Sequence, residues 1–273
     1  MLLTIDIGNT VVTLGVFEGG QLNTTLRVAT DTRRLADEYG AILTDVLRIK
    51  GVDPAAISSA CLCSVVPPLT VVFSEVCSSF FGVTPLIVSA GVRTGLPILY
   101  DNPRDVGADR IADAVASINL YGAPLIVVDL GTATVFDAIS RDGEYLGGAI
   151  APGINLAAES LFFNTSQLRR VELIAPKSAI GRSTIASLQS GLLLGYAGLV
   201  STMVQRFKDE IGHDAQVIGT GGLVNVIAPE APVFDHINQD LTLVGLRLIY
   251  EMNQGQKTTP GNDRESHERT VNR

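Results

Sequence analysis

Short apolar runs at the start of the chain predict strands. The run "MLLTIDIG" at 1–8 is apolar up to Asp6 and then turns at Gly8. "VVTLGVF" and "QLNTTLRV" follow it, and "EGG" between them is a hairpin signal. The pattern therefore predicts a three-stranded meander whose first strand ends in an Asp-x-Gly turn.

The same pattern returns in the middle of the chain. "PLIVVDLGTA" matches "MLLTIDIGNT", "TVFDAIS" matches "VVTLGVF", "RDG" replaces "EGG", and "EYLGGAIA" is the third strand. The two aspartates, Asp6 and Asp129, lie 123 residues apart. An internal repeat of this kind predicts two similar halves, which we expect at residues 1–121 and 122–253.

Helical patterns alternate with further strands. Helices are predicted from about 35 to 50, over "PPLTVVFSEVCSSFFG", from near Asp105 to Tyr121, from about Thr184 onward, and over "DLTLVGLRLIYEM" with Asp240 as N-cap. "GRST" at 181–184 offers Ser183 or Thr184 as the cap of the long helix. "ISSACLCSVV", "PLIV" and "QVIGTGG" read as strands. The first helix is expected to bury one face, consisting of Leu35, Tyr39, Ile42, Leu43 and Val46. The whole pattern predicts an α/β protein.

Composition and charge narrow the function. Apolar residues make up 46% of the chain, enough for an ordered core, whereas 254–273 is almost devoid of them and is predicted to be a disordered polar tail. The formal net charge of −8 disfavours non-specific nucleic-acid binding. We expect no membrane span, because no continuous apolar run approaches about 20 residues, and a cytoplasmic location. Cys61, Cys63 and Cys77 are expected to be buried reduced thiols.

The two Asp-Gly turns are the first candidates for chemistry. A carboxylate at the end of a strand can hold Mg²⁺, and glycine turns expose backbone N–H groups to phosphate oxygens. Short polar side chains accompany both turns, namely Asn9, Thr10, Thr132 and Thr134. One such aspartate alone is explained as the cap of a β-turn. Two at matching positions favour a pair of turns that clamp a triphosphate.

Two further stretches carry candidate residues. In "YDNPRDVGADR" at 100–110, Asp105 suits the first turn of a helix, but Asp109 next to Arg110 is a candidate base for a hydroxyl acceptor. "GTGG" at 219–222 would let the backbone approach a ring or a ribose closely. Signatures of P-loop enzymes, protein kinases and serine hydrolases do not occur in the sequence.

Several longer phrases resemble one family. "DIGNT", "SVVPPLT", "TGLPILYDNPRDVGADRI", "DLGTATVFDAIS", "GEYLGGAIAPGI", "LQSGLLLGY" and "DLTLVGLRLIYE" resemble the type III pantothenate kinases, in order, over about residues 1–252. The resemblance implies a duplicated ribonuclease-H-like fold of the acetate and sugar kinase, Hsp70 and actin superfamily, with the nucleotide between the halves. It implies transfer of the γ-phosphate of ATP to pantothenate, which gives 4'-phosphopantothenate in the first step of coenzyme A synthesis.

The resemblance also implies roles for individual residues. Asp109 would be the general base, and Asp129 would bind a monovalent cation, K⁺ or NH₄⁺, beside the Mg²⁺ that accompanies ATP. Contacts to ATP are implied for Asp6, Ile7, Gly8, Asn9, Thr10, Val11, Val12, Thr13 and Thr132. Contacts to pantothenate are implied for Tyr100, Gly107, Ala108, Asp109, Arg110 and Thr184. A homodimer is implied as well, and the long helix from Thr184 is a candidate part of its interface.

One position departs from the family pattern, and three alternatives stay open. Val11 stands where family members often have a polar residue such as Asn, and we expect this to alter nucleotide fit. The alternatives are a kinase of another small hydroxyl substrate, an actin-like or Hsp70-like ATPase, and a non-catalytic ATP-binding regulator. The length of 273 residues disfavours the ATPase, and the presence of Asp6, Asp109 and Asp129 favours catalysis.

Overall fold

The first half of the chain forms a mixed five-stranded sheet. The structure is a computed structural model and describes residues 1–254. The sheet has the order β3-β2-β1-β4-β5. Its strands are β1 (Leu2–Ile7), β2 (Val11–Glu18), β3 (Gln21–Ala29), β4 (Ser59–Ser64) and β5 (Leu86–Ile87). β1, β2 and β3 form the predicted antiparallel meander, and β4 adds to β1 in parallel.

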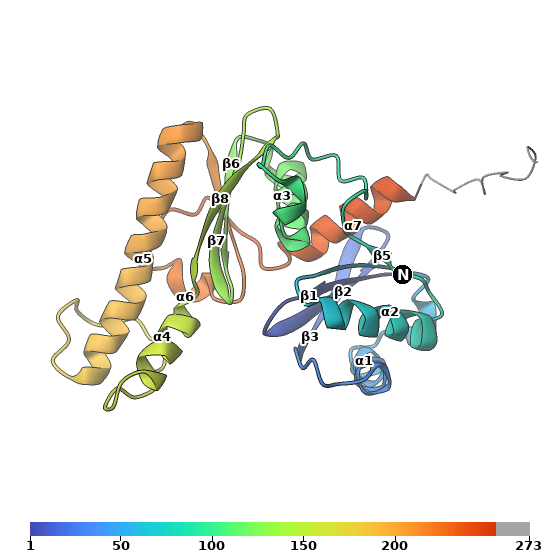
Figure 1. Cartoon of the computed structure of the whole chain (residues 1–273), viewed down its shortest axis with the longest axis horizontal. Coiled ribbons are helices and arrows are strands. Elements are labelled where there is room, and N and C mark those ends of the chain that lie inside the picture. Colours follow the sequence, from blue (N-terminus) through green and yellow to red (C-terminus); the bar gives the residue numbers. More distant parts are fainter. Residues whose placement is uncertain (255–273) are drawn as a thin grey trace, which may run out of the picture.

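The second half repeats this sheet. Its order is β10-β9-β6-β7-β8, which is the same arrangement counted from the opposite edge. The strands are β6 (Leu125–Leu130), β7 (Ala133–Ile139), β8 (Tyr145–Pro152), β9 (Gln216–Thr220) and β10 (His236–Ile237). The predicted repeat of the meander is therefore confirmed. Figure 1 shows the two sheets side by side, the second carrying the long helix.

The pairing of the two hairpins shows that the predicted alignment of their second strands is shifted by one residue. Asp6 pairs with Thr13 across the first hairpin, but Asp129 pairs with Val135 across the second. The second turn is one residue shorter, so Val135 corresponds to Thr13 and the alignment of "TVFDAIS" with "VVTLGVF" is wrong by one position. In a strand, a shift of one residue exchanges the two faces of the sheet, so the correct register decides which side chains are equivalent.

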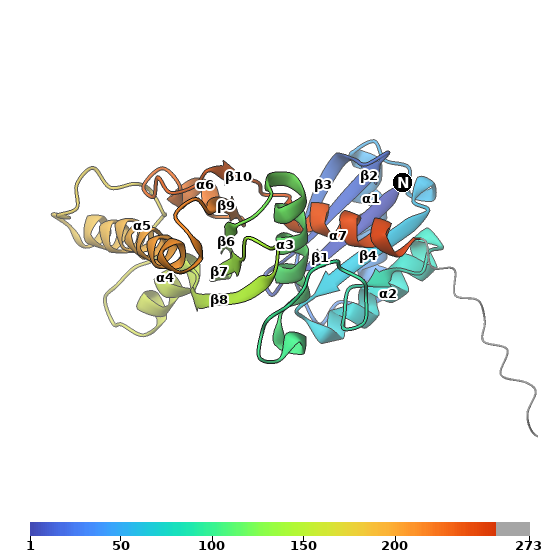
Figure 2. The same ribbon diagram turned by 90° about the horizontal axis from the view of Figure 1, so that it is seen from above.

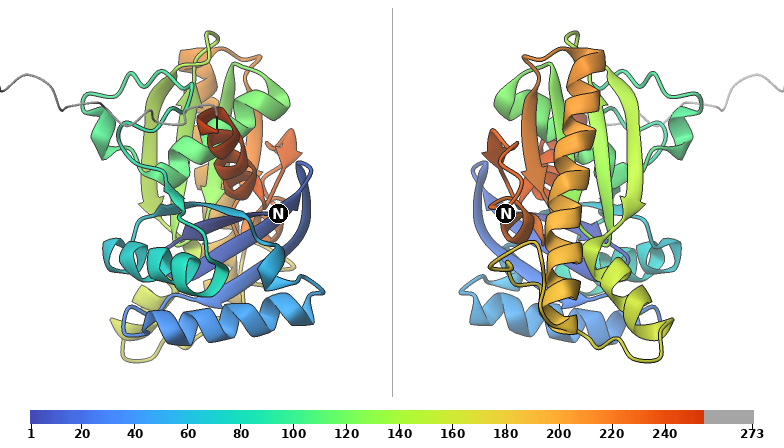
Figure 3. Two further views of the ribbon diagram at one scale, coloured as in Figure 1. Left: turned by 90° about the vertical axis from the view of Figure 1, so that its right-hand side faces the viewer. Right: turned by 90° about the vertical axis from the view of Figure 1, so that its left-hand side faces the viewer.

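Helices cover both sheets and fill the space between them. They are α1 (Ala36–Ile49), α2 (Pro67–Phe81), α3 (Ala108–Tyr121), α4 (Ile154–Phe163), α5 (Thr184–Ile211), α6 (Val224–Ile227) and α7 (Leu241–Asn253), with 3-10 turns at Pro54–Ala56 and Pro103–Asp105. Figure 3 shows α1 and α2 beneath the first sheet and α5 along the outer face of the second. In Figure 2, α3 and α7 lie in the middle of the molecule, between the two sheets.

The two central helices are exchanged between the halves. α7 is the last helix of the chain, yet it packs on β1, β2 and β4 of the first sheet, while α3 from the first half packs on β6 and β7 of the second sheet as well as on β4 of its own. Their backbones touch, because a Cβ on Gly245 would collide with the carbonyl of Ala112. One apolar cluster, including Leu125, Tyr145 and Leu246, fills this central layer. The division at residue 121 in the sequence stays a prediction, since this layer joins both parts.

Most predicted helices are confirmed, with local corrections. The third helix begins at Ala108 and not near Asp105, which ends a 3-10 turn whose first N–H donates to the side chain of Asn102. Leu35 is exposed at the N-cap of α1 and does not belong to its buried face. Ser183 caps α5 by accepting from the N–H of Ala186 at 3.2 Å, whereas Asp240 precedes α7 without a side-chain cap.

Some elements were not predicted. α4, α6 and β10 have no counterpart in the sequence analysis, because α6 and β10 are very short and α4 is mostly apolar, which gives it only a weak helical periodicity. The predicted tail from 254 lies outside the described residues from 255 onward, while Gln254 follows the last turn of α7.

Two predictions about apolar residues have different outcomes. Cys61, Cys63 and Cys77 are buried free thiols, as predicted. Helix α5, however, is long and apolar enough by length and composition to cross a membrane, and 28% of its most apolar stretch is buried. A single helix with this property also occurs in soluble proteins, so the finding alone assigns no membrane.

Candidate functional site

The two Asp-Gly turns meet at the centre of the molecule. The hydroxyl oxygens of Thr10 and Thr132 lie 2.8 Å apart and share a hydrogen bond. Each turn is closed by its glycine, since the N–H of Gly8 donates to Val11 O at 3.2 Å and that of Gly131 to Ala133 O at 3.0 Å. The duplicated sheets therefore bring together the ends of β1 and β6, which lie far apart in the sequence.

Asp6 lies at the end of β1 beside a thiol. Cys63 is its direct neighbour on β4, and the Cys63 Sγ–H donates to Oδ1 of Asp6 at 3.4 Å. Burial, helped by the negative charge of Asp109, raises the pKa of Asp6 to about 7. A cation close to a carboxylate in this environment would stabilise its ionised form.

Asp129 ends β6 in a matching environment. Burial and the charges of Asp109 and Asp6 raise its pKa to about 7. Gly221, with φ +88°, lies against it, and any Cβ there would collide with Oδ1 of Asp129. The "GTGG" turn thus keeps space around this carboxylate, a role that the sequence analysis did not assign to it.

Asp109 lies in the first turn of α3, and its charge acts on both strand-end aspartates. Its Oδ1 accepts from the N–H of Arg110 at 2.8 Å. A Cβ at position 107 would collide with the same oxygen, so Gly107 is required for this arrangement of the helix start. The predicted base is therefore close to Asp6 and to Asp129.

One helical turn further, Asp113 is buried. Its Oδ1 accepts from the hydroxyl of Thr242 on α7 at 2.7 Å. Burial and the charge of Asp129 raise the pKa of Asp113 well above its usual range, although the hydrogen bond from Thr242 opposes this. The sequence analysis assigned no role to Asp113.

Arg110 points into a buried polar cluster. Its Nε and Nη2 donate to Oδ1 of Asp137, at 3.0 and 2.6 Å, and the hydroxyl of Tyr145 donates to the same oxygen at 2.7 Å. Tyr100, a predicted substrate residue, lies 6.2 Å from Tyr145 between ring centroids. Asp137 and Tyr145 were missed, although a single charge inside the apolar strand "TVFDAIS" indicates a buried partner.

The remaining predicted residues differ in which of their atoms a ligand could contact. Asn9, Thr10, Val11 and Thr132 are exposed on the turns, but the side chains of Ile7 and Val12 belong to the core and leave only their backbone for a ligand. Thr184 begins α5 at the end that Figures 1 and 2 place far from α3. The structure of one chain therefore does not bring Thr184 together with Asp109 and Arg110.

The residues suit a cation site whose remaining ligands come from a bound nucleotide. Among residues 1–254, no three His, Cys, Asp or Glu side chains are gathered into a set that would hold a metal ion alone. The strand-end carboxylates nevertheless supply hard oxygen donors, and Mg²⁺ in phosphate-binding sites is commonly held by one or two carboxylates plus substrate phosphates. This donor set suits Mg²⁺ bound to ATP better than a metal site made of protein alone.

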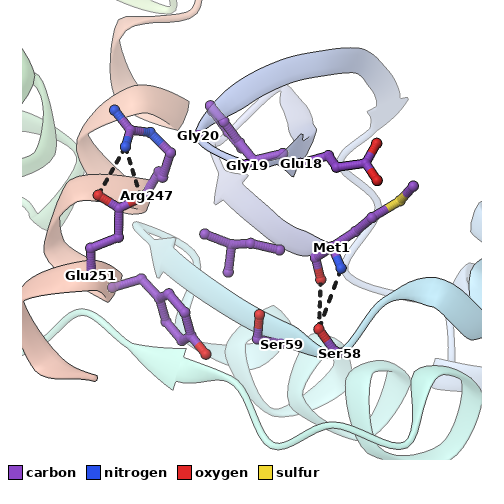
Figure 4. A pocket seen from close by; sticks show the side chains of 11 residues that line it. Met1, Glu18, Gly19, Gly20, Ser58, Ser59, Arg247 and Glu251 are labelled. Atoms are coloured by element: carbon purple, nitrogen blue, oxygen red, sulfur yellow. Dashed lines mark hydrogen bonds and ion pairs between the residues drawn. The ribbon is translucent and has the colours of Figure 1, made fainter. Parts of the chain in front are cut away.

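A separate pocket lies at the opposite end of the first sheet. It has a volume of about 270 Å³ and is lined by residues that include Leu2, Gly19, Ser59 and Tyr250. Figure 4 shows Arg247 paired there with Glu251, and the terminal amine of Met1 beside Ser58. Asp6 lies next to the last residue of β1 and this pocket is at the start of that strand, so the pocket is not part of the cluster around the two turns.

Two sheets of identical strand order, each with an aspartate at the end of its first strand, define the duplicated ribonuclease-H-like fold that actin-like ATPases and sugar kinases share. The predicted fold class is confirmed by a solved structure, the activator of the 2-hydroxyisocaproyl-CoA dehydratase from Clostridium difficile with bound ADPNP. Its TM-score is 0.52 at 12% identity, over 94% of this chain and 98% of that one.

Sequence comparisons define the family within this class. The family model described as type III pantothenate kinase matches residues 2–206. The type III pantothenate kinase of Moorella thermoacetica is 49% identical over 93% of this chain and 100% of its own length, and that of Geobacter sulfurreducens is 48% identical over the same shares. The chain belongs to the type III pantothenate kinase family.

Proposed function

We propose that this protein transfers the γ-phosphate of ATP to the primary hydroxyl of pantothenate and so performs the first step of coenzyme A synthesis. The observation that carries the proposal is the meeting of the two Asp-Gly turns next to Asp109, in a chain of this family. Phosphoryl transfer requires positioning and charge neutralisation more than covalent help from the protein, and these residues supply both.

The turns bind the nucleotide in this proposal. Backbone N–H groups from the segment Asp6–Thr13, together with the hydroxyls of Thr10 and Thr132, hold the phosphate oxygens. Bound Mg²⁺ would neutralise charge on the β- and γ-phosphates, and Asp6 and Asp129, at the two turns, would hold it or its waters. Because the turns now bond to each other through the two threonines, ATP must replace that contact with its own oxygens.

Asp109 acts on the acceptor. Its carboxylate accepts the proton of the pantothenate hydroxyl and orients the oxygen for in-line attack. Gly107, Ala108 and Arg110 contact the acceptor from the start of α3, and Tyr100 contacts it from the preceding loop. Asp129 binds K⁺ or NH₄⁺, and this positive charge lowers the repulsion between two anionic reactants.

The assembly is proposed to be a homodimer. The outer surface near the start of α5 carries exposed apolar side chains, among them Leu156, Phe163 and Ile185. A second copy that covers them would also explain Thr184, which can reach a substrate only in a neighbouring protomer if it lies far from Asp109 in its own. We propose no nucleic-acid or membrane partner, and a cytoplasmic location.

The test is phosphorylation of pantothenate by the purified protein, with K⁺ or Na⁺ as the only monovalent cation. Turnover that requires K⁺ supports the kinase and the cation site together. Equal turnover with both ions keeps the kinase and removes the cation role of Asp129. ATP binding without turnover would favour a regulator or a kinase of another hydroxyl substrate.

A further inference from the structure

We infer that Asp137 and Tyr145 are positioning residues that aim the guanidinium of Arg110 at the carboxylate of the acceptor, and so make the enzyme specific for an acidic substrate. The inference rests on the proposed function, because it takes pantothenate as the acceptor. It assigns roles to two residues of the second half that belong to neither predicted set of substrate contacts.

The geometry fixes Arg110 from one side only. Three donors, two from Arg110 and one from Tyr145, converge on the single oxygen Oδ1 of Asp137. The Arg110 side chain is 12% exposed and that of Asp137 is 3% exposed, so water contributes little to this pairing. A guanidinium held through Nε and Nη2 keeps its Nη1 donors, which make no protein hydrogen bond within the described residues, for another carboxylate.

The aromatic ring of Tyr145 adds a second constraint. The Arg110 guanidinium lies 5.7 Å from its ring centroid, within the range of a cation–π contact. Tyr145 also neighbours Tyr100, which lies against Gly147, where a Cβ would stand 3.3 Å from the Tyr100 ring. Tyr145 thus touches or borders both predicted substrate side chains while its own hydroxyl points at Asp137.

Charge supports the same conclusion. Burial works to lower the pKa of Arg110, but the hydrogen bond and the negative charge of Asp137 outweigh it and raise that pKa above its ordinary value. Arg110 therefore stays cationic in a region where Asp6, Asp109 and Asp129 would otherwise repel an acidic substrate. A positioned arginine recognises a planar carboxylate better than a freely rotating one, because less side-chain freedom is lost on binding.

The experiment compares two acceptors, pantothenate and pantothenamide, in which a neutral carboxamide replaces the carboxylate. We expect Tyr145→Phe, which keeps the ring and removes only the hydroxyl, to raise the KM for pantothenate about tenfold with little change in kcat. The preference for pantothenate over pantothenamide in kcat/KM should fall by the same factor. Asp137→Asn should reduce that preference further, because it removes the charge that fixes Arg110.

Controls separate positioning from stability. Asp214→Asn breaks the exposed 2.7 Å pair between Arg141 and Asp214 in the same half of the chain and should leave the preference unchanged. An equal loss on both acceptors in Tyr145→Phe, or no loss on either, would overturn the inference while the wild-type activity keeps the proposed function. A wild-type protein without turnover on pantothenate would overturn the proposed function, and this inference with it.

Discussion

The two halves use equivalent positions of their second strands in opposite ways. Gly15 on β2 lies opposite Thr4, and Asp137 on β7 lies opposite Val127, which are the same register positions counted from Asp6 and Asp129. Gly15 packs closely against Leu243 of α7, whereas Asp137 accepts hydrogen bonds from Arg110 of α3. Each residue meets the central helix that its own sheet receives from the other half.

This difference shows how a repeated fold can hold a site that is not repeated. The first sheet needs a small residue, because α7 packs closely against it and a Cβ on Gly15 would stand 3.0 Å from side-chain atoms of Leu22 and Leu243. The second sheet has room for the carboxylate of Asp137, which holds Arg110, the residue that we propose binds the acceptor. The repeat gives both halves the same sheet, and a difference at one position of matching strands places Arg110 in the second half only, where we propose that it binds the acceptor.

The largest loss of stability from a single substitution is expected when the two positions are made alike. Gly15→Asp would force a carboxylate into the tightly packed space among Leu22, Leu243 and Thr4, and should lower the free energy of unfolding by at least about 3 kcal/mol. Gly15→Ala is the matched control and should cost much less, since the nearest atoms are the flexible ends of side chains. Chemical denaturation of both variants measures the difference, and equal losses would show that volume, not charge, sets the constraint.

Asp109 lies between the halves and should be needed for chemistry rather than for stability. We expect Asp109→Asn to lower kcat about 100-fold or more, because the amide cannot accept the hydroxyl proton. Asp105→Asn is the control, since Asp105 is exposed in the preceding turn and, within residues 1–254, its side chain bonds only to Asn102, at 2.8 Å. Steady-state kinetics on pantothenate decide the matter, and an unchanged kcat in Asp109→Asn would refute its role as base.

The raised pKa values of Asp6 and Asp129 predict that the free energy of unfolding falls as pH rises. Folding raises the pKa of Asp6 and of Asp129 from 3.8 to about 7, so the folded state holds protons that the unfolded state has lost. The contribution of these two carboxyls to the free energy of unfolding is fully present below pH 3.8 and is lost as pH rises through about 7. The loss is on the order of 4 kcal/mol at most for each carboxyl.

Thermal melting in chelator, without K⁺, measures this loss. The Tm should decrease between pH 5 and about 8, and Mg²⁺ with K⁺ should oppose the decrease by binding the charged carboxylates. The double variant Asp6→Asn/Asp129→Asn should show a flatter profile. A wild-type Tm that rises over this range would mean that the two carboxyls are not destabilised by burial.

The smallest effect is expected at the Asp-Gly turn of the first half, which we propose binds the nucleotide. Val11 is 39% exposed at the start of β2, where an amide could reach a phosphate or its water. We expect Val11→Asn to lower the KM for ATP about threefold, the size of one weak hydrogen bond. Val71→Asn changes an exposed valine on α2 and should have no effect, while an unchanged KM in Val11→Asn would remove the proposed role of this position.

The sequence predicted the strands and turns better than the contacts between side chains. Short apolar runs ending at Asp6 and Asp129 predicted both meanders, because strand periodicity and turn residues are local properties. The register after the second turn was not predictable in this way, since a turn shorter by one residue leaves the apolar pattern almost the same. The positioning residues Asp137 and Tyr145 were missed for a related reason, because their partner Arg110 comes from another element and only the folded chain brings them together.

The exchange of α3 and α7 has a consequence for any attempt to divide the protein. A fragment ending at residue 121 would keep the first sheet but lack α7, which covers one face of that sheet, and would leave α3 without β6 and β7. The complementary fragment would carry α7 with nothing to cover. The two pieces should therefore be insoluble when made singly and should regain a folded, active enzyme when co-expressed, so that the unit of folding is the whole chain and not the repeat.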